Sequence, residues 1–420
     1  MIGSMRRDQA ESEQEPKVLW APGVLVDSEN LHLGGAALVL RAGRVVECVP
    51  GLAAARRSAN RMGVALEDLG RGILTPGLVN AHSHLELHDL AGEVSGSGGF
   101  GAWIGKLMAL RAGREPEALA RGVHAGARRL AQTGTTAVGD IDSLGLSEQG
   151  LRASGLRVVH YREALDAGDA ARTAGVLQTM EALPDGSDLL HPGLAPHAPY
   201  TVSPGLWQGL GELATRRELQ VTVHWAETEA EVDWLAGRGG PLAGLLGTPP
   251  GPSGLDLIEA AGLLGPHTSL VHGNLPAPGE VQRVAQAGSV VVHCPGTHAF
   301  FERERFPLEQ YQAAGVCLAL GTDSSASNVD LDMRAEMRAL RRSHAELAPG
   351  EVWRMATSAA SRALGLEAGC LEPGHAADLA WFAVEGSEAA EVLDFLTGEL
   401  PEVLGTWISG VSRGASGSAP

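Results

Sequence analysis

Histidine and aspartate side chains stand where short apolar segments of this 420-residue chain end. Residues i and i+2 of a strand point to the same side, so His82 and His84 of the H-x-H pair would enter one space together. Neutral imidazoles and a carboxylate suit a divalent transition ion, and three His with one Asp leave room for a water of lowered pKa. The pattern therefore predicts a hydrolytic metal centre. The residues at the segment ends are His82, His84, His197, His224, His272, His293 and Asp323.

Hydrolysis at such a centre also requires groups that move protons. Glu227 stands three residues after His224, and His272 ends the apolar segment TSLV, so both are suitably placed in sequence for general acid–base work. Each residue alone has an ordinary structural explanation, such as a buried core histidine for His224 or His272 and a turn cap for Asp323. Their recurrence at successive segment ends favours a common site.

The elements that must position these residues alternate regularly. Eight short runs rich in Val, Leu and Ile, bounded by turn residues, alternate with segments of helical spacing across residues 71–367. Near-continuous apolar runs are typical of parallel strands buried on both faces. Eight such alternations predict an α/β fold, a distorted (β/α)₈ TIM-type barrel, in which residues at the carboxyl ends of the strands face the active-site mouth.

The two ends of the chain have a different pattern. Residues 17–70 and 368–410 are rich in short β-type runs and polar breaks, and we expect them to pair into one small composite β-sandwich domain. Residues 1–16 are expected to form a flexible leader and residues 411–420 a flexible tail.

Composition excludes several classes of partner. Fifty acidic residues against 32 basic ones give a net charge of −18, which disfavours nucleic acid and anionic membrane surfaces. No apolar stretch approaches the roughly 18 residues of a membrane span, and no signal peptide is visible. The four cysteines are scattered, as expected for reduced thiols, so we expect a cytoplasmic protein and leave open a homo-oligomer.

Several motifs together resemble the amidohydrolase superfamily: TPGLVNAHSH, HWAE, VHG, GTDS and, near the C-terminus, LEPGHAADLAWF. The resemblance implies that one divalent metal ion, Zn²⁺ or Fe²⁺, is bound by four side chains, and that His272 hydrogen-bonds the attacking water. Binuclear members often carry a carboxylated lysine at the fourth strand, but the only lysines here, Lys17 and Lys106, lie elsewhere, so a mononuclear site is favoured. The implied ligands are His82, His84, His224 and Asp323.

The H-x-x-E spacing at Glu227 resembles the deaminase branch, in which this glutamate carries protons to a ring nitrogen and the leaving amine. The segments APHAPYTVS and GTDSSASNVDLDMRAEM resemble the group that acts on adenosine-type nucleosides with altered 5′ ends, together with the related chlorohydrolases. The segments HSHLEL, GFGAWI and HCPGTHAFFERERFPLEQY resemble in particular the aminodeoxyfutalosine deaminases of menaquinone biosynthesis. That likeness implies hydrolysis of 6-aminodeoxyfutalosine to futalosine and ammonia, with Glu227, His272 and Asp323 as catalytic residues. The alternatives are an adenosine, S-adenosylhomocysteine or methylthioadenosine deaminase, a guanine deaminase, a chlorohydrolase-like enzyme, or a non-catalytic binding barrel.

Five further residues are predicted to contact a small-molecule nucleoside substrate. Glu86 and His197 are expected at the ribose, and Trp103 is expected to stack on an aromatic part of the substrate. Arg303 and Arg305 are expected to pair with the benzoate carboxylate, because a guanidinium suits bidentate carboxylate binding.

Overall fold

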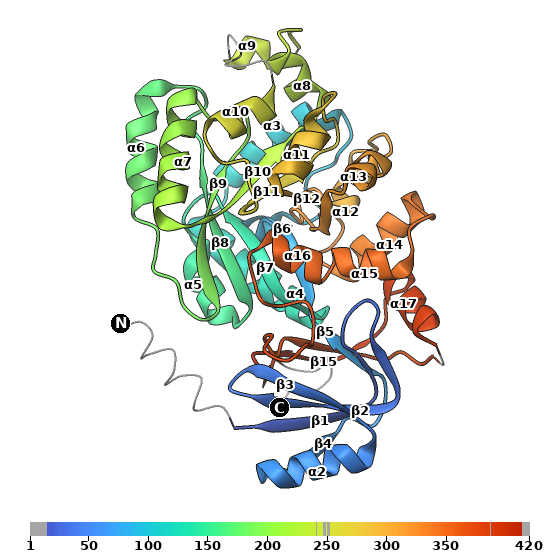
Figure 1. The fold of residues 1–420 in the computed structure, drawn as a ribbon. Coiled ribbons are helices and arrows are strands. Elements are labelled where there is room, and N and C mark those ends of the chain that lie inside the picture. Colours follow the sequence, from blue (N-terminus) through green and yellow to red (C-terminus); the bar gives the residue numbers. More distant parts are fainter. Residues whose placement is uncertain (1–14, 241, 247–248, 250–252, 387, 414–420) are drawn as a thin grey trace.

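The protein divides into a barrel and a smaller sheet built from both ends of the chain, as Figure 1 shows. The structure is a computed structural model, and it describes residues 15–240, 242–246, 249, 253–386 and 388–413. The predicted leader lies almost wholly outside these residues, as does the tail beyond residue 413. No helix in the described ranges combines the length and apolarity needed to cross a bilayer.

Eight parallel strands form the barrel sheet in the order of the chain, which confirms the predicted (β/α)₈ architecture. Their side chains are almost entirely buried, which explains the near-continuous apolar runs in the sequence. The first and last strands approach where the amides of Thr322 and Asp323 donate to the carbonyl of His82. The strands are β6 (Leu78–Ser83), β7 (Thr135–Asp142), β8 (Arg157–Ala164), β9 (Leu190–Pro196), β10 (Gln220–Trp225), β11 (Thr268–His272), β12 (Val290–His293) and β13 (Cys317–Leu320).

The helices between the strands form because their apolar residues recur at helical spacing. In α4 (Pro116–Gln132) a proline occupies the first turn, and Leu119, Val123 and Ala127 make one buried face. The hydroxyl of Ser203 caps α7 (Pro204–Arg217) by accepting the amide of Leu206. The others are η1 (Leu85–Leu90), α3 (Gly99–Ala112), α5 (Ser147–Ser154), α6 (Ala170–Glu181), α8 (Glu229–Leu235), α9 (Ala243–Leu246), α10 (Gly254–Ala260), α11 (Glu280–Ala287), α12 (Pro295–Phe300), α13 (Leu308–Ala314), α14 (Met333–Ser343), α15 (Pro349–Met355), α16 (Ser358–Ala363) and α17 (Ala389–Gly398).

The two ends of the chain meet in one connected mixed sheet, with α2 (Leu52–Met62) packed on β1, β2 and β3. This confirms the predicted composite domain. Two boundaries differ from the prediction. The strand Ile73–Pro76 joins the N-terminal and C-terminal segments of this sheet by pairing with β1 and β14, so the N-terminal segment reaches residue 76 rather than 70. At the other end, Val411–Ser412 adds an edge strand where a loose tail was expected. The strands are β1 (Lys17–Leu25), β2 (Leu31–Arg41), β3 (Arg44–Pro50), β4 (Leu66–Asp68), β5 (Ile73–Pro76), β14 (Leu379–Phe382), β15 (Val403–Ile408) and β16 (Val411–Ser412).

Candidate active site

The histidine and aspartate side chains of interest converge at the carboxyl ends of the barrel strands. His82 lies within β6 and His84 directly after it, while His224 and His272 lie at the ends of β10 and β11. Asp323 follows β13. Residues far apart in the chain meet here because the strands are parallel and end on one rim.

Three of the eight non-glycine residues with positive φ in the described chain lie at the same rim. His272, Asp323 and Ala226 adopt the left-handed region, with φ of 73°, 58° and 50°. Non-glycine residues rarely occupy this region, and such strain typically persists where the surrounding structure enforces it at functional sites. The strained backbone sets the direction in which these side chains leave the ends of their strands.

Three imidazoles are arranged as a ligand set. One ring nitrogen from each of His82, His84 and His224 lies within 4.8 Å of the others. The carboxylate Oδ1 of Asp323 lies 3.7 Å from His82 Nε2 and 3.6 Å from His84 Nε2. Neither ring nitrogen of buried His82 makes a hydrogen bond to the described part of the chain. An unpaired buried imidazole beside two others and a carboxylate is the donor set expected for a divalent ion, so these residues fit one.

Burial and hydrogen bonding prepare the rings for such a role. Burial lowers the pKa of His82 and His84, which keeps both imidazoles neutral. His224 Nδ1 lies 2.8 Å from the carbonyl oxygen of His197, to which it donates, so Nε2 is left to face the other imidazoles. Burial raises the pKa of Asp323, but its contact with His82 and the nearby His272 outweigh burial and hold that pKa well below its usual value.

Glu227 faces the imidazole cluster from just beyond β10. Its Oε1 lies 3.7 Å from Nε2 of His272, and its side chain is 7% exposed. The amides of Ala226 and Glu227 both donate to the carboxylate of Glu231, which fixes the backbone here. Burial raises the pKa of Glu227, but His272 and Arg303 outweigh it, so the net pKa is lowered. Burial also lowers the pKa of His272 to about 3, so its imidazole is neutral near pH 7.

The two arginines predicted to bind substrate lie in different surroundings. Arg303 is 13% exposed and donates through Nη2 to Glu227 Oε1 at 2.8 Å, so it belongs to the site through its contact with the glutamate. Arg305 pairs with Glu309 and Glu346 at the surface, and its Nε donates to the carbonyl of Ser343. The prediction that Arg305 binds substrate is therefore corrected, because its guanidinium is already held by surface carboxylates.

His197 lies beside His224, and Glu86 follows His84 by two residues; their contacts with a substrate stay a prediction. Glu86 is fully buried, 3.7 Å from Nη1 of Arg111, and neither carboxylate oxygen makes a hydrogen bond to the described residues. Burial raises its pKa to about 7. The ring of His197 lies tilted against that of His224, with 5.1 Å between the ring centroids. Its Nδ1 forms a hydrogen bond with the hydroxyl of Thr201. One nitrogen of His197 also lies within 4.8 Å of a carboxylate oxygen of Glu163, which sequence reasoning did not single out.

Trp103 belongs mainly to an apolar cluster. Its ring is 6% exposed, and Nε1 donates to the carbonyl of Ala326 at 3.0 Å. The rings of Phe100 and Phe301 contact it at 5.7 and 5.3 Å between centroids, and both remain partly exposed. Stacking of Trp103 itself on a substrate stays a prediction, while its neighbours offer the more accessible aromatic surface.

Glu231 fixes the backbone beside Glu227, and the sequence analysis did not single it out. The signal was present, because Thr228 and Glu231 form the T-x-x-E pattern of a helix start, and the Thr228 hydroxyl does accept the Glu231 amide. The carboxylate, however, bonds the amides of residues 226 and 227 rather than that of Thr228. A pattern that normally stabilises a helix end thus positions the catalytic candidate before it.

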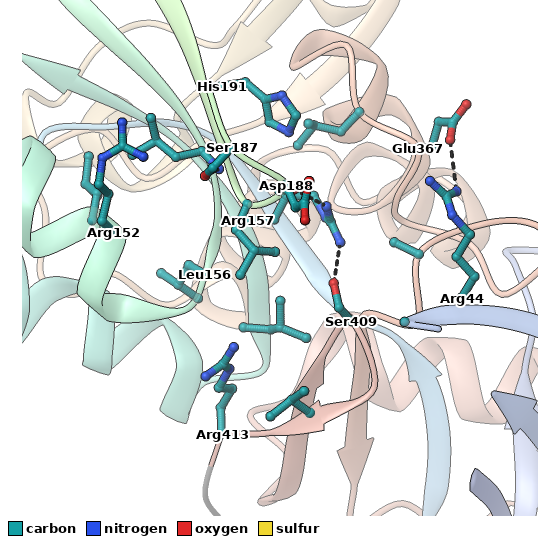
Figure 2. Close-up of a pocket in the computed structure, with 18 of the residues that line it drawn as sticks. Arg44, Arg152, Leu156, Arg157, Ser187, Asp188, His191, Glu367, Ser409 and Arg413 are labelled. Atoms are coloured by element: carbon teal, nitrogen blue, oxygen red, sulfur yellow. Dashed lines mark hydrogen bonds and ion pairs between the residues drawn. The ribbon is translucent and has the colours of Figure 1, made fainter. Parts of the chain in front are cut away.

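A separate pocket lies at the opposite, amino-terminal ends of the barrel strands, against the terminal sheet (Figure 2). Arg157 at the start of β8 reaches Ser409, and Arg44 pairs with Glu367 across the pocket wall. The barrel residues that line it lie at or just before the starts of β8 and β9, so this pocket is remote from the imidazole cluster at the other end of the strands.

An imidazole and carboxylate cluster at the carboxyl-terminal rim of a (β/α)₈ barrel, with a small sheet from both chain ends, defines a class of metal-dependent hydrolases. Residues 73–412 match the model of the amidohydrolase family, and the chain belongs to this family. It is thus a hydrolase that acts on C–N bonds.

Three relatives illustrate the likeness. The chain is 30% identical to a 5-methylthioadenosine/S-adenosylhomocysteine deaminase of Thermococcus kodakarensis, over 86% of this chain and 84% of the relative. It is 32% identical to an aminodeoxyfutalosine deaminase of Deinococcus radiodurans, over 72% and 75% of the two chains. A zinc-containing crystal structure of an adenosine deaminase from Xanthomonas campestris superposes with a TM-score of 0.80 at 26% identity, covering 94% of this chain and 92% of that one.

Proposed function

We propose that the protein is a hydrolytic adenine-nucleoside deaminase whose substrate is 6-aminodeoxyfutalosine, as in menaquinone biosynthesis. The reaction adds water at C6 of the purine and releases the amino group as ammonia, giving futalosine. The observation that carries the proposal is the position of Glu227, whose Oε1 lies 3.7 Å from His272 beside the imidazole cluster. A metal ligand set together with a proton-carrying carboxylate is what attack of water on a cyclic amidine requires.

The proposed cofactor is one divalent ion, Zn²⁺ or Fe²⁺, held by His82, His84, His224 and Asp323. When bound, such an ion supplies a water of lowered pKa for attack on the ring. The four residues are suited to hold it because their donor atoms converge, and burial keeps the imidazoles of His82 and His84 neutral. The carbonyl of His197 fixes which nitrogen of His224 is presented.

The protein side chains then move the protons. His272 and Asp323 orient the water, and Asp323 accepts its proton. Glu227, ionised at the start, takes up the other proton of the water and delivers it to N1, which offsets the negative charge that develops on the ring. When the C6–N bond breaks, the proton held by Asp323 passes through Glu227 to the departing amine, so both protons of the water are accounted for. Each such proton-transfer partner typically contributes about 10²–10⁴ in rate. The buried carboxylate of Glu86, whose oxygens make no hydrogen bond to the described residues, is suited to accept hydrogen bonds from the ribose hydroxyls. His197, beside His224, is proposed to reach the same sugar.

Two observations support a substrate with an aromatic carboxylate. The relative in Deinococcus radiodurans is an aminodeoxyfutalosine deaminase. Phe100 and Phe301 offer partly exposed rings, and the guanidinium of Arg303 lies 4.9 Å from the Phe301 ring centre. An aromatic surface beside a guanidinium suits a benzoate group.

The test is a coupled ammonia assay on purified protein with aminodeoxyfutalosine, adenosine, S-adenosylhomocysteine and methylthioadenosine, with metal analysis of the same sample. We expect each adenine nucleoside that is turned over to release ammonia, and we expect aminodeoxyfutalosine to have the highest kcat/KM. Metal analysis should find about one metal ion per chain. A higher kcat/KM for methylthioadenosine or S-adenosylhomocysteine would reassign the substrate in line with the Thermococcus relative. No ammonia from any of the four nucleosides would refute the deaminase itself.

A further inference from the structure

Arg303 makes an unusual contact for a residue beside an acid–base catalyst. Its Nη2 donates to Oε1 of Glu227 at 2.8 Å, and both side chains are largely buried. Oε1 is also the oxygen that lies 3.7 Å from Nε2 of His272, so it is the oxygen directed toward the imidazole cluster. The guanidinium and the reacting proton therefore require the same carboxylate oxygen.

This competition affects catalysis. A carboxylate oxygen that accepts a charge-assisted hydrogen bond from a guanidinium is a weaker base than a free one. Arg303 also lowers the pKa of Glu227, against the opposing effect of burial. In this arrangement Glu227 is well positioned but is a poor proton carrier until Arg303 withdraws.

The same arginine has unused hydrogen-bonding capacity. Its Nη1 is buried and has no hydrogen-bond partner among the described residues. The guanidinium carbon lies 4.9 Å from the ring centre of Phe301, whose partly exposed ring contacts Phe100 and Trp103. A planar guanidinium with a free N–H beside aromatic rings is suited to bind a carboxylate attached to an aromatic group.

We propose that Arg303 determines specificity for nucleosides carrying a carboxylate on the 5′ side, and that binding of this carboxylate draws the guanidinium away from Glu227 Oε1 and so frees that oxygen for proton transfer. The inference rests on the proposed deaminase function and adds a coupling between substrate charge and catalysis. Arg303 affects the reaction through its ion pair with Glu227, and it binds the substrate through the carboxylate on the 5′ side of the nucleoside. A neutral nucleoside leaves the ion pair in place and turns over slowly.

The experiment compares a carboxylated nucleoside, aminodeoxyfutalosine, with its own carboxamide, which has the same shape without the charge. For the wild type we expect kcat/KM to favour the carboxylate by about a hundredfold, the order that a missing partner for a buried polar group produces. In Arg303→Gln we expect this ratio to fall to about threefold or less, with a higher KM for the carboxylate and about a tenfold higher kcat for the carboxamide, since a freed base regains part of its 10²–10⁴ contribution. Arg303→Lys, which keeps the charge but not the planar fork, should lie between the two.

Matched variants separate this role from a structural one. Arg305→Gln, in the same segment but held by surface carboxylates, should keep the wild-type ratio. A wild type that does not distinguish carboxylate from carboxamide overturns the proposal, as does an Arg303→Gln variant that loses both activities equally. Loss of the discrimination in Arg111→Gln but not in Arg303→Gln would assign the carboxylate to the arginine beside Glu86 and likewise overturn it. Failure of the deaminase function is distinguishable, because wild-type protein would then release no ammonia from either compound.

Discussion

Replacing Glu227 by glutamine tests the centre of the proposed mechanism. The change keeps the shape of a side chain that is 7% exposed but removes its ability to carry a proton. The glutamine oxygen can still accept from Arg303 Nη2, now 2.8 Å from Oε1, so the local packing should survive. Hydrogen bonds to charged groups contribute about 1.5–3 kcal/mol, and a partial loss of this order should appear as a modest fall in Tm.

The expected kinetic effect is much larger than the effect on stability. Losing a general acid–base group costs about 10²–10⁴ in rate, which at about 1.36 kcal/mol per decade raises the barrier by about 3–5 kcal/mol. The assay is ammonia release at saturating nucleoside, with metal content measured on the same preparation. Metal content should be unchanged, because Glu227 is not among the residues proposed to bind the ion.

The matched control is Glu229→Gln, two residues further on at the exposed start of α8. It removes one exposed carboxylate from the same segment, where a charge in the first helical turn contributes only about 0.3–1 kcal/mol to stability. The enzyme should therefore stay folded, and kcat should stay within a factor of about two of the wild type. A Glu227→Gln enzyme within tenfold of the wild type would refute the assigned role. Loss of the metal in that variant would show instead that Glu227 supports the ligand set.

Three further predictions address the metal, the packing and the pH dependence. Chelation should abolish ammonia release, and Zn²⁺ or Fe²⁺ should restore it. His82→Ala should hold clearly less metal per chain than the wild type, because one of the four proposed ligands is lost; full metal content in that variant would exclude His82 as a ligand. Gly211→Ala places a methyl group 1.9 Å from the carbonyl oxygen of Ala261 and should destabilise the folded state by about 1–3 kcal/mol, measured by thermal unfolding. Gly205→Ala in the same helix is the control: the atom nearest to its methyl group is 3.9 Å away, so the change should be neutral or stabilising. Equal Tm values for the two variants would contradict this packing. Burial raises the pKa of Glu336 from 4.5 to about 8, so the folded state holds this proton more tightly than the unfolded chain does; the resulting stability is present below about pH 4.5 and is lost as the pH rises toward 8. Glu336→Gln should therefore reduce the fall in Tm between about pH 5 and pH 8, removing up to about 5 kcal/mol of pH-dependent stability. An unchanged fall would mean that Glu336 is ionised throughout this range.

The barrel was predictable because its signals are local. Apolar runs such as VVVH at β12 and the helical spacing of α4 fix the type of each element within a few residues. Pairing between the chain ends was predictable only in outline. The bridging strand Ile73–Pro76 is four residues long and lies directly before β6, so nothing in its own sequence tells whether it pairs with the terminal sheet or continues into the barrel.

The sequence by itself determined which chemical groups this protein has and at which strand ends they stand, because strand period and parallel order place the histidines and Asp323 on one rim. Only the tertiary structure decided which arginine of the ERERF segment turns inward. Arg303 and Arg305 have the same charge two positions apart, but one guanidinium meets Glu227 and the other meets surface carboxylates. The physical reason is that an ion pair depends on the position of its partner, and Glu227 lies 76 residues away in the chain, so no local pattern encodes the contact.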